Sequence, residues 1–346
     1  MDNCSVIDRL KGANGFARPV LALAPMEGVT NSIFRNLICE IGGVDLVATE
    51  FVRITSGRQK IRPFVRHPQH RVALQIQLMA SEGSVLAENI EFLKQRGVLD
   101  DGDWLDLNVG CPSKRVNAHG AGAALLLEPS KLLEMVHRMR AVHKGPLSLK
   151  TRVGYQSAED YPNILKCLAK CPLDFVTIHA RTRCGQYTEP VNWNYLRKAV
   201  QILPFSVLGN GEVWSADDAL RMLEQTGVHG IMCGRGVIRD PFLFARICAK
   251  LTGSAPPFAG RGELLKLAAE LARRYAQADS DRKVGVFKEF AGWLSKNPCM
   301  GRELFLGVKR LQTFSEILDA LERLSVSSEN KESLSRKYQG VREGRI

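Results

Sequence analysis

The segment Trp104-Leu105-Asp106-Leu107-Asn108-Val109-Gly110-Cys111-Pro112 carries the pattern that decides the fold of this chain. Leucine or valine occupies positions 105, 107 and 109, and the polar Asp106 and Asn108 lie between them. Because successive side chains of a β-strand point to opposite faces, this pattern predicts a strand with one apolar and one polar face. Gly110 and Pro112 then predict a turn that ends the strand.

Seven other short runs rich in Val, Ile and Leu share this character, and segments of helical periodicity separate them. With the first run, the predicted strands are Val20–Pro25, Val44–Glu50, Arg71–Leu78, Trp104–Val109, Leu147–Val153, Asp174–Ala180, Phe205–Asn210 and Gly230–Gly234. Their starts lie about 30 residues apart, the length of a repeated β-α unit. Eight units over residues 19–250 therefore predict an α/β fold, a (β/α)8 TIM barrel whose interior receives the polar strand faces.

The segment between the first two strands shows how the helices are predicted. Apolar residues from Ile33 to Ile41 recur at helical spacing, Thr30 precedes them as a candidate cap, and Gly42 and Gly43 follow as a stop. Similar helices are predicted at Ser84–Gln95, Ser130–Val142, Ala158–Ala169, Trp193–Ile202 and Ala216–Gln225.

The chain changes character after residue 254, where Ala255-Pro256-Pro257 predicts a linker. The segments that follow have only helical periodicity: Arg261–Gln277, Lys283–Lys296, Gly301–Thr313 and Ser315–Leu324. We expect a small all-helical domain over residues 255–325. Residues 326–346 are rich in Ser, Lys, Arg and Glu, so they predict a disordered tail.

Composition narrows the class of protein. The 346 residues include 48 Lys and Arg against 36 Asp and Glu, a net charge of +12, which favours RNA or DNA as a partner. No apolar stretch is long enough to span a membrane and the first residues lack the apolar core of a signal peptide, so we expect a cytoplasmic protein. The nine cysteines are odd in number and form no C-x-x-C pair, which disfavours a disulfide framework or a metal site.

Polar residues gather at the late ends of the predicted strands, which meet at the rim where barrel enzymes carry their active sites. They are Glu27, Glu50, Gln77, Asn108, Lys150, His179, Asn210 and Arg235. Each alone is equally well explained as satisfying neighbours inside the barrel, but eight at one rim predict a functional site. Cys111 follows the fourth strand in a turn bracketed by Gly110 and Pro112, which makes it the candidate nucleophile or proton donor.

Two glycine-rich turns follow the last two strands, Gly209-Asn210-Gly211-Glu212 and Cys233-Gly234-Arg235-Gly236. Barrels often bind a phosphate between these two loops, and Arg235 adds a guanidinium there. The chain has no P-loop or dinucleotide fingerprint, so a phosphate-bearing cofactor in this barrel suggests FMN. Lys150 would then stabilise negative charge on the reduced flavin, or it would form an ion pair with Glu27 or Glu212.

These residues together resemble the tRNA-dihydrouridine synthases. The motifs occur in the order of that family over about residues 20 to 250, and a helical region follows, as in the family. They are Ala24-Pro25-Met26-Glu27-Gly28-Val29-Thr30, Thr49-Glu50-Phe51-Val52-Arg53, Leu107-Asn108-Val109-Gly110-Cys111-Pro112-Ser113-Lys114, His179-Ala180-Arg181-Thr182, Asn210-Gly211-Glu212 and Gly234-Arg235-Gly236.

The resemblance implies a role for individual residues. FMN would be held by Pro25, Met26, Glu27, Gln77, Lys150 and His179, and at its phosphate end by Asn210, Gly211, Glu212, Gly234 and Arg235. Cys111 matches the proton donor of the family, and Asn108 matches a residue close to the target uracil. Arg53 in Glu50-Phe51-Val52-Arg53, together with Arg152, resembles the RNA contacts of the bacterial branch that modifies position 16, although Val109 stands where that branch often has an aromatic residue.

The main hypothesis is therefore reduction of a uridine in the tRNA D-loop to dihydrouridine, with FMN as cofactor, NADPH as its reductant and tRNA as the partner. Hydride addition at C6 of uracil leaves a carbanion-like C5 that Cys111 protonates. Lys288 and Lys309 of the helical region would contact the tRNA, and no obligate protein partner is indicated. The alternatives are an FMN barrel that acts on a free pyrimidine, resembling dihydroorotate dehydrogenases, and a barrel that binds RNA without catalysis.

Overall fold

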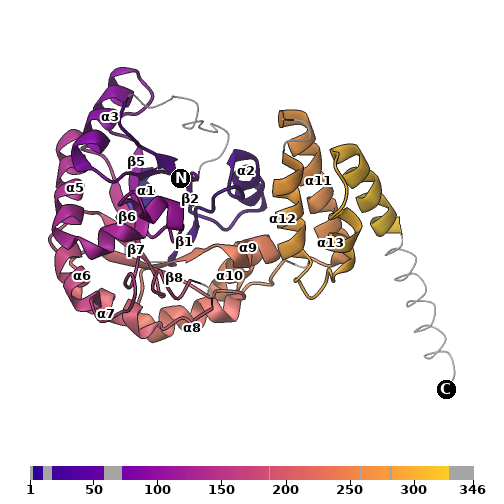
Figure 1. Cartoon of the computed structure of the whole chain (residues 1–346). Helices are drawn as coiled ribbons and strands as arrows, with labels where there is room; N and C mark the ends of the chain where they lie inside the picture. Colours follow the sequence, from indigo (N-terminus) through magenta and orange to yellow (C-terminus); the bar gives the residue numbers. More distant parts are fainter. Residues whose placement is uncertain are drawn as a thin grey trace.

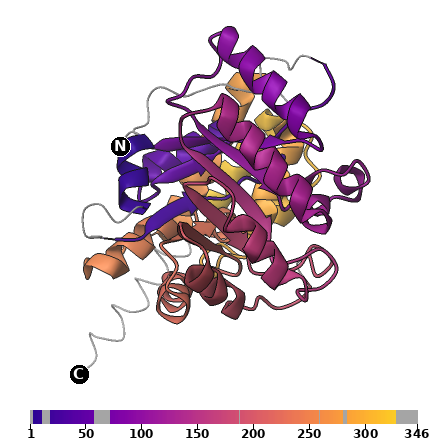
Figure 2. The ribbon, with the colours of Figure 1, turned by 90° about the vertical axis from the view of Figure 1, so that its left-hand side faces the viewer.

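The computed structural model describes residues 3–10, 18–57, 72–186, 188–257, 259–279 and 283–326. Eight parallel strands close into a barrel, because each pairs with the next and β9 pairs with β1. They are β1 (Val20–Leu23), β2 (Leu46–Ala48), β4 (Ala73–Met79), β5 (Trp104–Val109), β6 (Leu147–Arg152), β7 (Phe175–His179), β8 (Ser206–Asn210) and β9 (Gly230–Cys233). The predicted barrel is confirmed, and Figure 1 and Figure 2 show its strands enclosed by helices.

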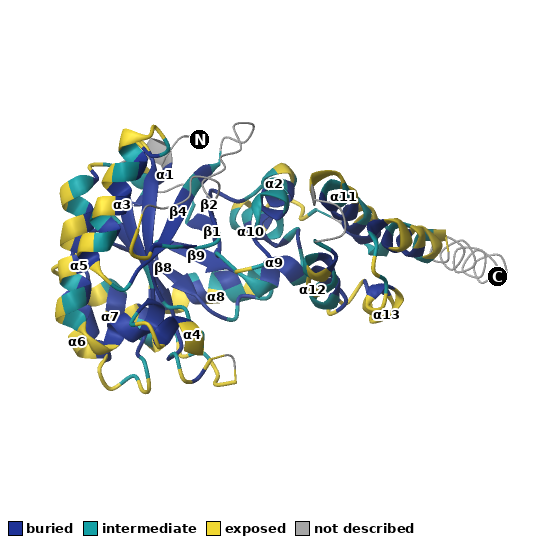
Figure 3. Cartoon of the chain, turned by 45° about the horizontal axis from the view of Figure 1, so that its top comes forward, coloured by how far each residue is buried: buried dark blue, intermediate teal, exposed yellow. Residues whose placement is uncertain are grey.

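The helices around the barrel keep their exposed faces outward (Figure 3). They are α2 (Ser32–Ile41), α3 (Gly83–Gln95), α5 (Pro129–Val142), α6 (Tyr161–Leu168), α7 (Asn194–Ile202), α8 (Ala216–Thr226) and α10 (Leu243–Thr252). Shorter elements lie in the loops: α4 (Lys114–Asn117), a 3-10 helix η2 (Gly122–Leu127) and α9 (Arg235–Arg239). None of the helices in these described ranges combines the length and apolar character that crossing a membrane requires.

The predicted cap of α2 is wrong. Asn31, not Thr30, caps the helix, because its side chain accepts hydrogen bonds from the amides of Ile33 and Phe34. The Thr30 hydroxyl instead accepts the Met26 amide at 2.7 Å. Thr30 therefore fixes the loop that follows β1, at the rim of the barrel.

The two strand faces separate as predicted, but the inward face is not polar throughout. Leu105 and Leu107 pack in the large cluster between the strands and the helices. Trp104 and Phe175 point inward and form an apolar layer at the amino end of the barrel, with ring centroids 5.0 Å apart. The polar residues lie above this layer, so the barrel interior is apolar at one end and polar at the other.

Several described elements were not predicted from the sequence, and two of them lie at the ends of the barrel. Helix α1 (Asn3–Leu10) lays Val6 and Leu10 on the apolar layer at the amino end. Strand β3 (Val52–Arg53) extends the sheet beside β4 at the opposite end. Both depend on contacts with distant residues, which a local pattern does not reveal.

The C-terminal helices pack beside the barrel (Figure 1). They are α11 (Arg261–Asp279), α12 (Val284–Leu294), α13 (Glu303–Val308) and a last described helix over 314–326. Arg274 of α11 binds Glu40 of α2 through both guanidinium nitrogens at 2.8 and 2.6 Å. The predicted helix at Gly301–Thr313 is shorter and ends at Val308, and it does not start at Gly301 because a φ of 76° there does not fit a right-handed helix. The predicted tail lies outside the described residues from 327 onward.

Candidate active site

A pocket of about 490 Å³ opens at the carboxyl ends of the barrel strands. Most of its lining comes from the ends of β1, β5, β6, β7, β8 and β9, and α12 closes one side. The predicted site residues that line it are Pro25, Met26, Glu27, Asn108, Cys111, Lys150, Arg152, His179, Asn210, Gly211, Glu212, Gly234 and Arg235. The structure thus brings together residues spread over more than 200 positions of the chain.

The Cys111 loop is held from several sides. Asn108 accepts the amides of Gly110 and Cys111 on its side-chain oxygen, at 3.1 and 2.9 Å. Arg152 donates from Nε to the Gly110 carbonyl at 2.8 Å, and Asn117 donates from Nδ2 to the Cys111 carbonyl at 2.9 Å. These hydrogen bonds engage the backbone amides and carbonyls of Gly110 and Cys111, so they hold the backbone that carries the thiol.

The surroundings of Cys111 keep its thiol protonated. Burial is the largest effect that raises its pKa, and Glu27 raises it further. The Ser113 amide, Arg152 and Arg53 act in the opposite direction, so the thiolate that remains after proton loss is stabilised. A thiol of this kind is suited to act as an acid rather than as a preformed nucleophile.

Several basic side chains line the pocket together and form what we call its basic wall. The pKa of His179 is well below its ordinary value, because the ring is buried and because Arg152, Lys150, Arg181 and Arg235 surround it. Burial and Arg152 lower the pKa of Lys150 to about 8. Basic groups that lower one another's pKa repel each other, and an anionic ligand in the pocket would relieve that repulsion.

Lys150 does not form either of the ion pairs considered from the sequence. Its ammonium donates to Asn210 Oδ1 at 3.3 Å, and Glu212 forms its ion pair with Arg181. Asn210 in turn donates to the Met232 carbonyl at 2.7 Å. The ammonium is therefore held at the base of the pocket, at the end of β6.

The turn after β8 requires glycine, because its φ is positive and neighbouring side chains lie too close for a Cβ. Gly211 has a φ of 129°, and a Cβ added there would lie 2.8 Å from Val191 Cγ1 and 3.2 Å from the His179 ring. A Cβ at Gly234 would lie 3.3 Å from the Met26 sulfur. Both glycines line the pocket beside the basic wall, and their backbone packs too closely against neighbouring side chains to carry a Cβ without displacing them.

Two tryptophans that the sequence did not single out surround Arg235. Trp214 and Trp293 are stacked with ring centroids 6.1 Å apart, and the Arg235 guanidinium lies 5.3 and 5.4 Å from their rings. Trp293 belongs to α12. No local signal indicated that it reaches the pocket, because its partners lie 58 and 79 positions earlier in the chain.

Four predicted site residues are not part of the pocket lining. Gln77 is wholly buried beneath Asn108, and Arg53 lies on β3 within electrostatic range of the Cys111 thiol. Lys288 lies on α12, where its charge lowers the pKa of Glu316, and Lys309 is exposed at the end of α13. Conversely, Phe51, Ser113 and Glu289 line the pocket without having been predicted.

The fold and the pocket are those of a (β/α)8 barrel that gathers basic side chains and a protonated thiol at the carboxyl ends of its strands, where barrel enzymes carry their active sites. Residues 22–311 match the family model described as "Dihydrouridine synthase (Dus)". The chain therefore belongs to the dihydrouridine synthase family, a family of oxidoreductases.

Curated relatives share most of the length of the chain. The tRNA-dihydrouridine(16) synthase of Aquipseudomonas alcaligenes is 32% identical over 88% of this chain and 99% of its own length. The protein of the same name from Cupriavidus necator is 31% identical over 88% of this chain and 97% of its own length. Histamine dehydrogenase from Rhizobium sp. 4-9 has 13% identity and a TM-score of 0.54 over 78% of this chain and 51% of its own, which shows likeness of fold alone.

Proposed function

We propose that this chain reduces uridine 16 in the D-loop of tRNA to 5,6-dihydrouridine, using FMN that NADPH reduces. Family membership and the identity to tRNA-dihydrouridine(16) synthases support this substrate. The observation that carries the proposal is the protonated Cys111 thiol on the rim of a pocket with a basic wall.

The residues of the pocket fit FMN. The glycine turns at Gly211 and Gly234 and the guanidinium of Arg235 would hold its phosphate. Pro25, Met26, Glu27, Lys150 and His179, with Asn210 and Glu212, would surround the rest of the cofactor. When bound, reduced FMN supplies the hydride that adds to C6 of uracil.

The chain itself supplies the proton. Hydride addition at C6 moves negative charge onto C5 and the C4 carbonyl oxygen, so C5 must be protonated to complete dihydrouridine. Cys111 donates its thiol proton to C5, and Arg152 and Arg53 stabilise the thiolate that forms. Asn108 holds the loop of this acid beside the target base, and solvent then returns the proton to Cys111.

The target uridine has to leave the tRNA stack to reach this pocket. We propose that Arg53 beside the rim, and Lys288 and Lys309 on the helical region over residues 255–325, hold the RNA through its phosphates. The net charge of +12 supports a polyanionic substrate. These phosphate contacts would hold the tRNA, and the residues of the barrel pocket would carry out the reduction.

The decisive experiment is a flavin titration of the purified holoenzyme. We expect a yellow protein that NADPH bleaches under anaerobic conditions and that an unmodified tRNA transcript reoxidises. A transcript with cytidine at position 16 is the matched control and should leave the flavin reduced. Reoxidation by free uracil or orotate but not by tRNA would select the free-pyrimidine enzyme, and a protein without flavin would select the non-catalytic RNA-binding barrel.

A further inference from the structure

A buried carboxylate lies one layer beneath the pocket and has no role in the chemistry described above. Asp106 is on β5, two residues before Asn108, so both side chains point into the barrel. It is 1% exposed, and burial raises its pKa to about 6. Among the described residues no basic group forms an ion pair with it, so the barrel keeps a costly buried acid.

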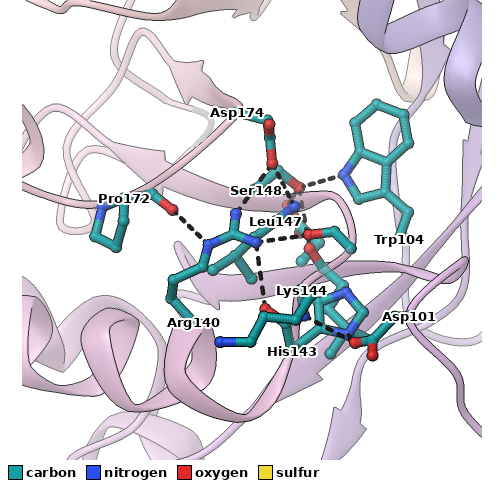
Figure 4. Close-up of polar contacts among 12 residues, drawn as sticks. Asp101, Trp104, Arg140, His143, Lys144, Leu147, Ser148, Pro172 and Asp174 are labelled. Carbon is teal, nitrogen blue, oxygen red and sulfur yellow. Dashed lines mark hydrogen bonds and ion pairs between the residues drawn. The ribbon is translucent and has the colours of Figure 1, made fainter.

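Hydrogen bonds anchor Asp106 from below. Its Oδ1 accepts the Ser148 hydroxyl at 2.6 Å and the Gln75 amide at 3.3 Å. Ser148 in turn accepts the indole N–H of Trp104 at 3.1 Å, which Figure 4 shows. The carboxylate is thus tied to the apolar layer at the amino end of the barrel.

A chain of amides runs from Asp106 up to the Cys111 loop. Gln77 donates from Nε2 to Asp106 Oδ2 at 2.7 Å, and its Oε1 accepts Asn108 Nδ2 at 2.8 Å. Asn108 Oδ1 is then turned toward the amides of Gly110 and Cys111. Three hydrogen-bonded steps therefore connect a buried carboxylate with the backbone of the proton donor.

Asp106 at one end of this hydrogen-bond series and the loop amides at the other end each require one orientation of the Gln77 and Asn108 side-chain amides, and the two requirements agree. A carboxylate accepts hydrogen bonds only, so Gln77 must present its NH₂ to Asp106 and its oxygen to Asn108. The backbone amides donate only, so Asn108 must present its oxygen to them and its NH₂ to Gln77. Without an acceptor at position 106, Gln77 can rotate, and Asn108 loses the partner that holds its oxygen against the loop.

We propose that Asp106 is a positioning residue, which acts through Gln77 and Asn108 to hold the Gly110–Cys111 loop and aim the Cys111 thiol. This inference rests on the proposed function, in which Cys111 protonates the uracil. It also explains why Gln77 is wholly buried beneath the pocket.

Two substitutions separate this role from the alternatives. Asp106→Leu removes every acceptor but keeps the branched shape of the side chain, whereas Asp106→Asn keeps one oxygen for Gln77 and loses the charge. We expect Asp106→Leu to lower the rate of single-turnover flavin reoxidation by tRNA about 10²-fold, the scale of a misplaced catalytic group. Asp106→Asn should restore most of that loss, and KM for tRNA and FMN content should change in neither variant.

Other roles predict other patterns. A purely space-filling residue would leave both variants fully active, and a residue that acts through its charge on Lys150 would impair both equally. Either pattern overturns the proposal. If Asp106→Leu does not fold, Gln77→Met interrupts the same series of hydrogen bonds with Asp106 still in place, and it should give the same fall in rate. An unchanged rate in Gln77→Met would contradict the positioning role.

A second measurement does not depend on turnover. Peptide mapping after iodoacetamide treatment reports the alkylation rate of Cys111, with exposed Cys184 as the internal reference. We expect a faster rate for Cys111 in Asp106→Leu and a wild-type rate in Asp106→Asn, because the loop is released only in the former. A changed alkylation rate in a protein that does not reduce tRNA would refute the proposed function but support the positioning role of Asp106. An unchanged alkylation rate in an active enzyme would refute the positioning role alone.

Discussion

The two ends of the barrel use the same kinds of residue in opposite ways. At the amino end, Asp45 is 1% exposed and accepts hydrogen bonds from Arg9, Arg18 and the Leu21 amide. Arg140 there binds Asp174 at 3.1 Å and three carbonyl groups (Figure 4). The arginines at this end therefore form ion pairs with neighbouring aspartates, and α1 covers the end of the barrel.

At the carboxyl end, basic side chains gather around a pocket. Lys150, Arg152, His179 and Arg235 share one wall of a pocket, and the pKa values of Lys150 and His179 are lowered. The difference teaches that an arginine or lysine at a strand end is not by itself a sign of function. A binding site is indicated where basic groups lie together, depress one another's pKa and face an open volume.

The largest expected effect is a loss of turnover when the thiol at the carboxyl end of the barrel is removed. Cys111→Ala should lower turnover about 10²- to 10⁴-fold, because general acid catalysis contributes that much. FMN content and tRNA affinity should stay at wild-type values, as the methyl group leaves the loop contacts intact. Single-turnover reoxidation of the flavin measures the effect, and Cys184→Ala, at an exposed thiol, is the control. Full activity of Cys111→Ala would assign the proton to another group.

The next effect tests the amino end. Asp45→Asn should lower the free energy of unfolding by about 2–3 kcal/mol, because two arginines lose their shared buried carboxylate. Activity per folded molecule should not change. Urea unfolding at pH 7 measures the loss, and Asp8→Asn on α1, at an exposed position, provides the matched control. A loss of turnover without a loss of stability would contradict the division of roles between the two ends.

A smaller effect concerns the helical region. Lys288→Glu together with Lys309→Glu should weaken tRNA binding about tenfold and lower its salt dependence, because two phosphate contacts are lost. FMN content should stay normal. Filter binding at several salt concentrations tests this, with the same charge change at Lys166 on α6, which is exposed, and at Lys198 on α7, which is exposed, as the control. If tRNA binding weakens equally in both double variants, the effect comes from net charge and not from contacts at Lys288 and Lys309.

The smallest effect is a pH dependence. Since the pKa of Lys150 is lowered to about 8, its ammonium is charged below pH 8 and increasingly neutral above it. The dissociation constant of FMN should therefore rise about fivefold between pH 7.5 and 9.5. Flavin fluorescence measures it, and Lys150→Met should bind FMN more weakly with no such rise. A rise that persists in Lys150→Met would assign the titration to a different group, such as Cys111.

Local patterns predicted much of the fold and of the site. Alternation in Trp104–Val109 places Asp106 and Asn108 inside the barrel, and the same reasoning places Lys150 and His179 at the pocket. Such predictions hold because the two-residue period of a strand and the shared carboxyl rim of a barrel follow from backbone geometry alone.

The cap of α2 shows where local patterns are insufficient. Thr30 and Asn31 are adjacent and both are good capping residues, so the sequence does not decide between them. The choice follows from the Met26 loop, which takes the Thr30 hydroxyl for its own amide. A tertiary contact thus overrides an equal local preference.

The sequence by itself determined the barrel, the position of Cys111 in a loop at its rim and the glycine turns next to the basic residues. These features depend on spacings within single segments. Only the tertiary structure decided that Trp293 reaches Arg235 from the helical region, and that Gln77 lies beneath the pocket and connects Asp106 with the Cys111 loop. Those relations arise from packing between residues far apart in the chain, and local periodicity carries no information about which distant side chains meet.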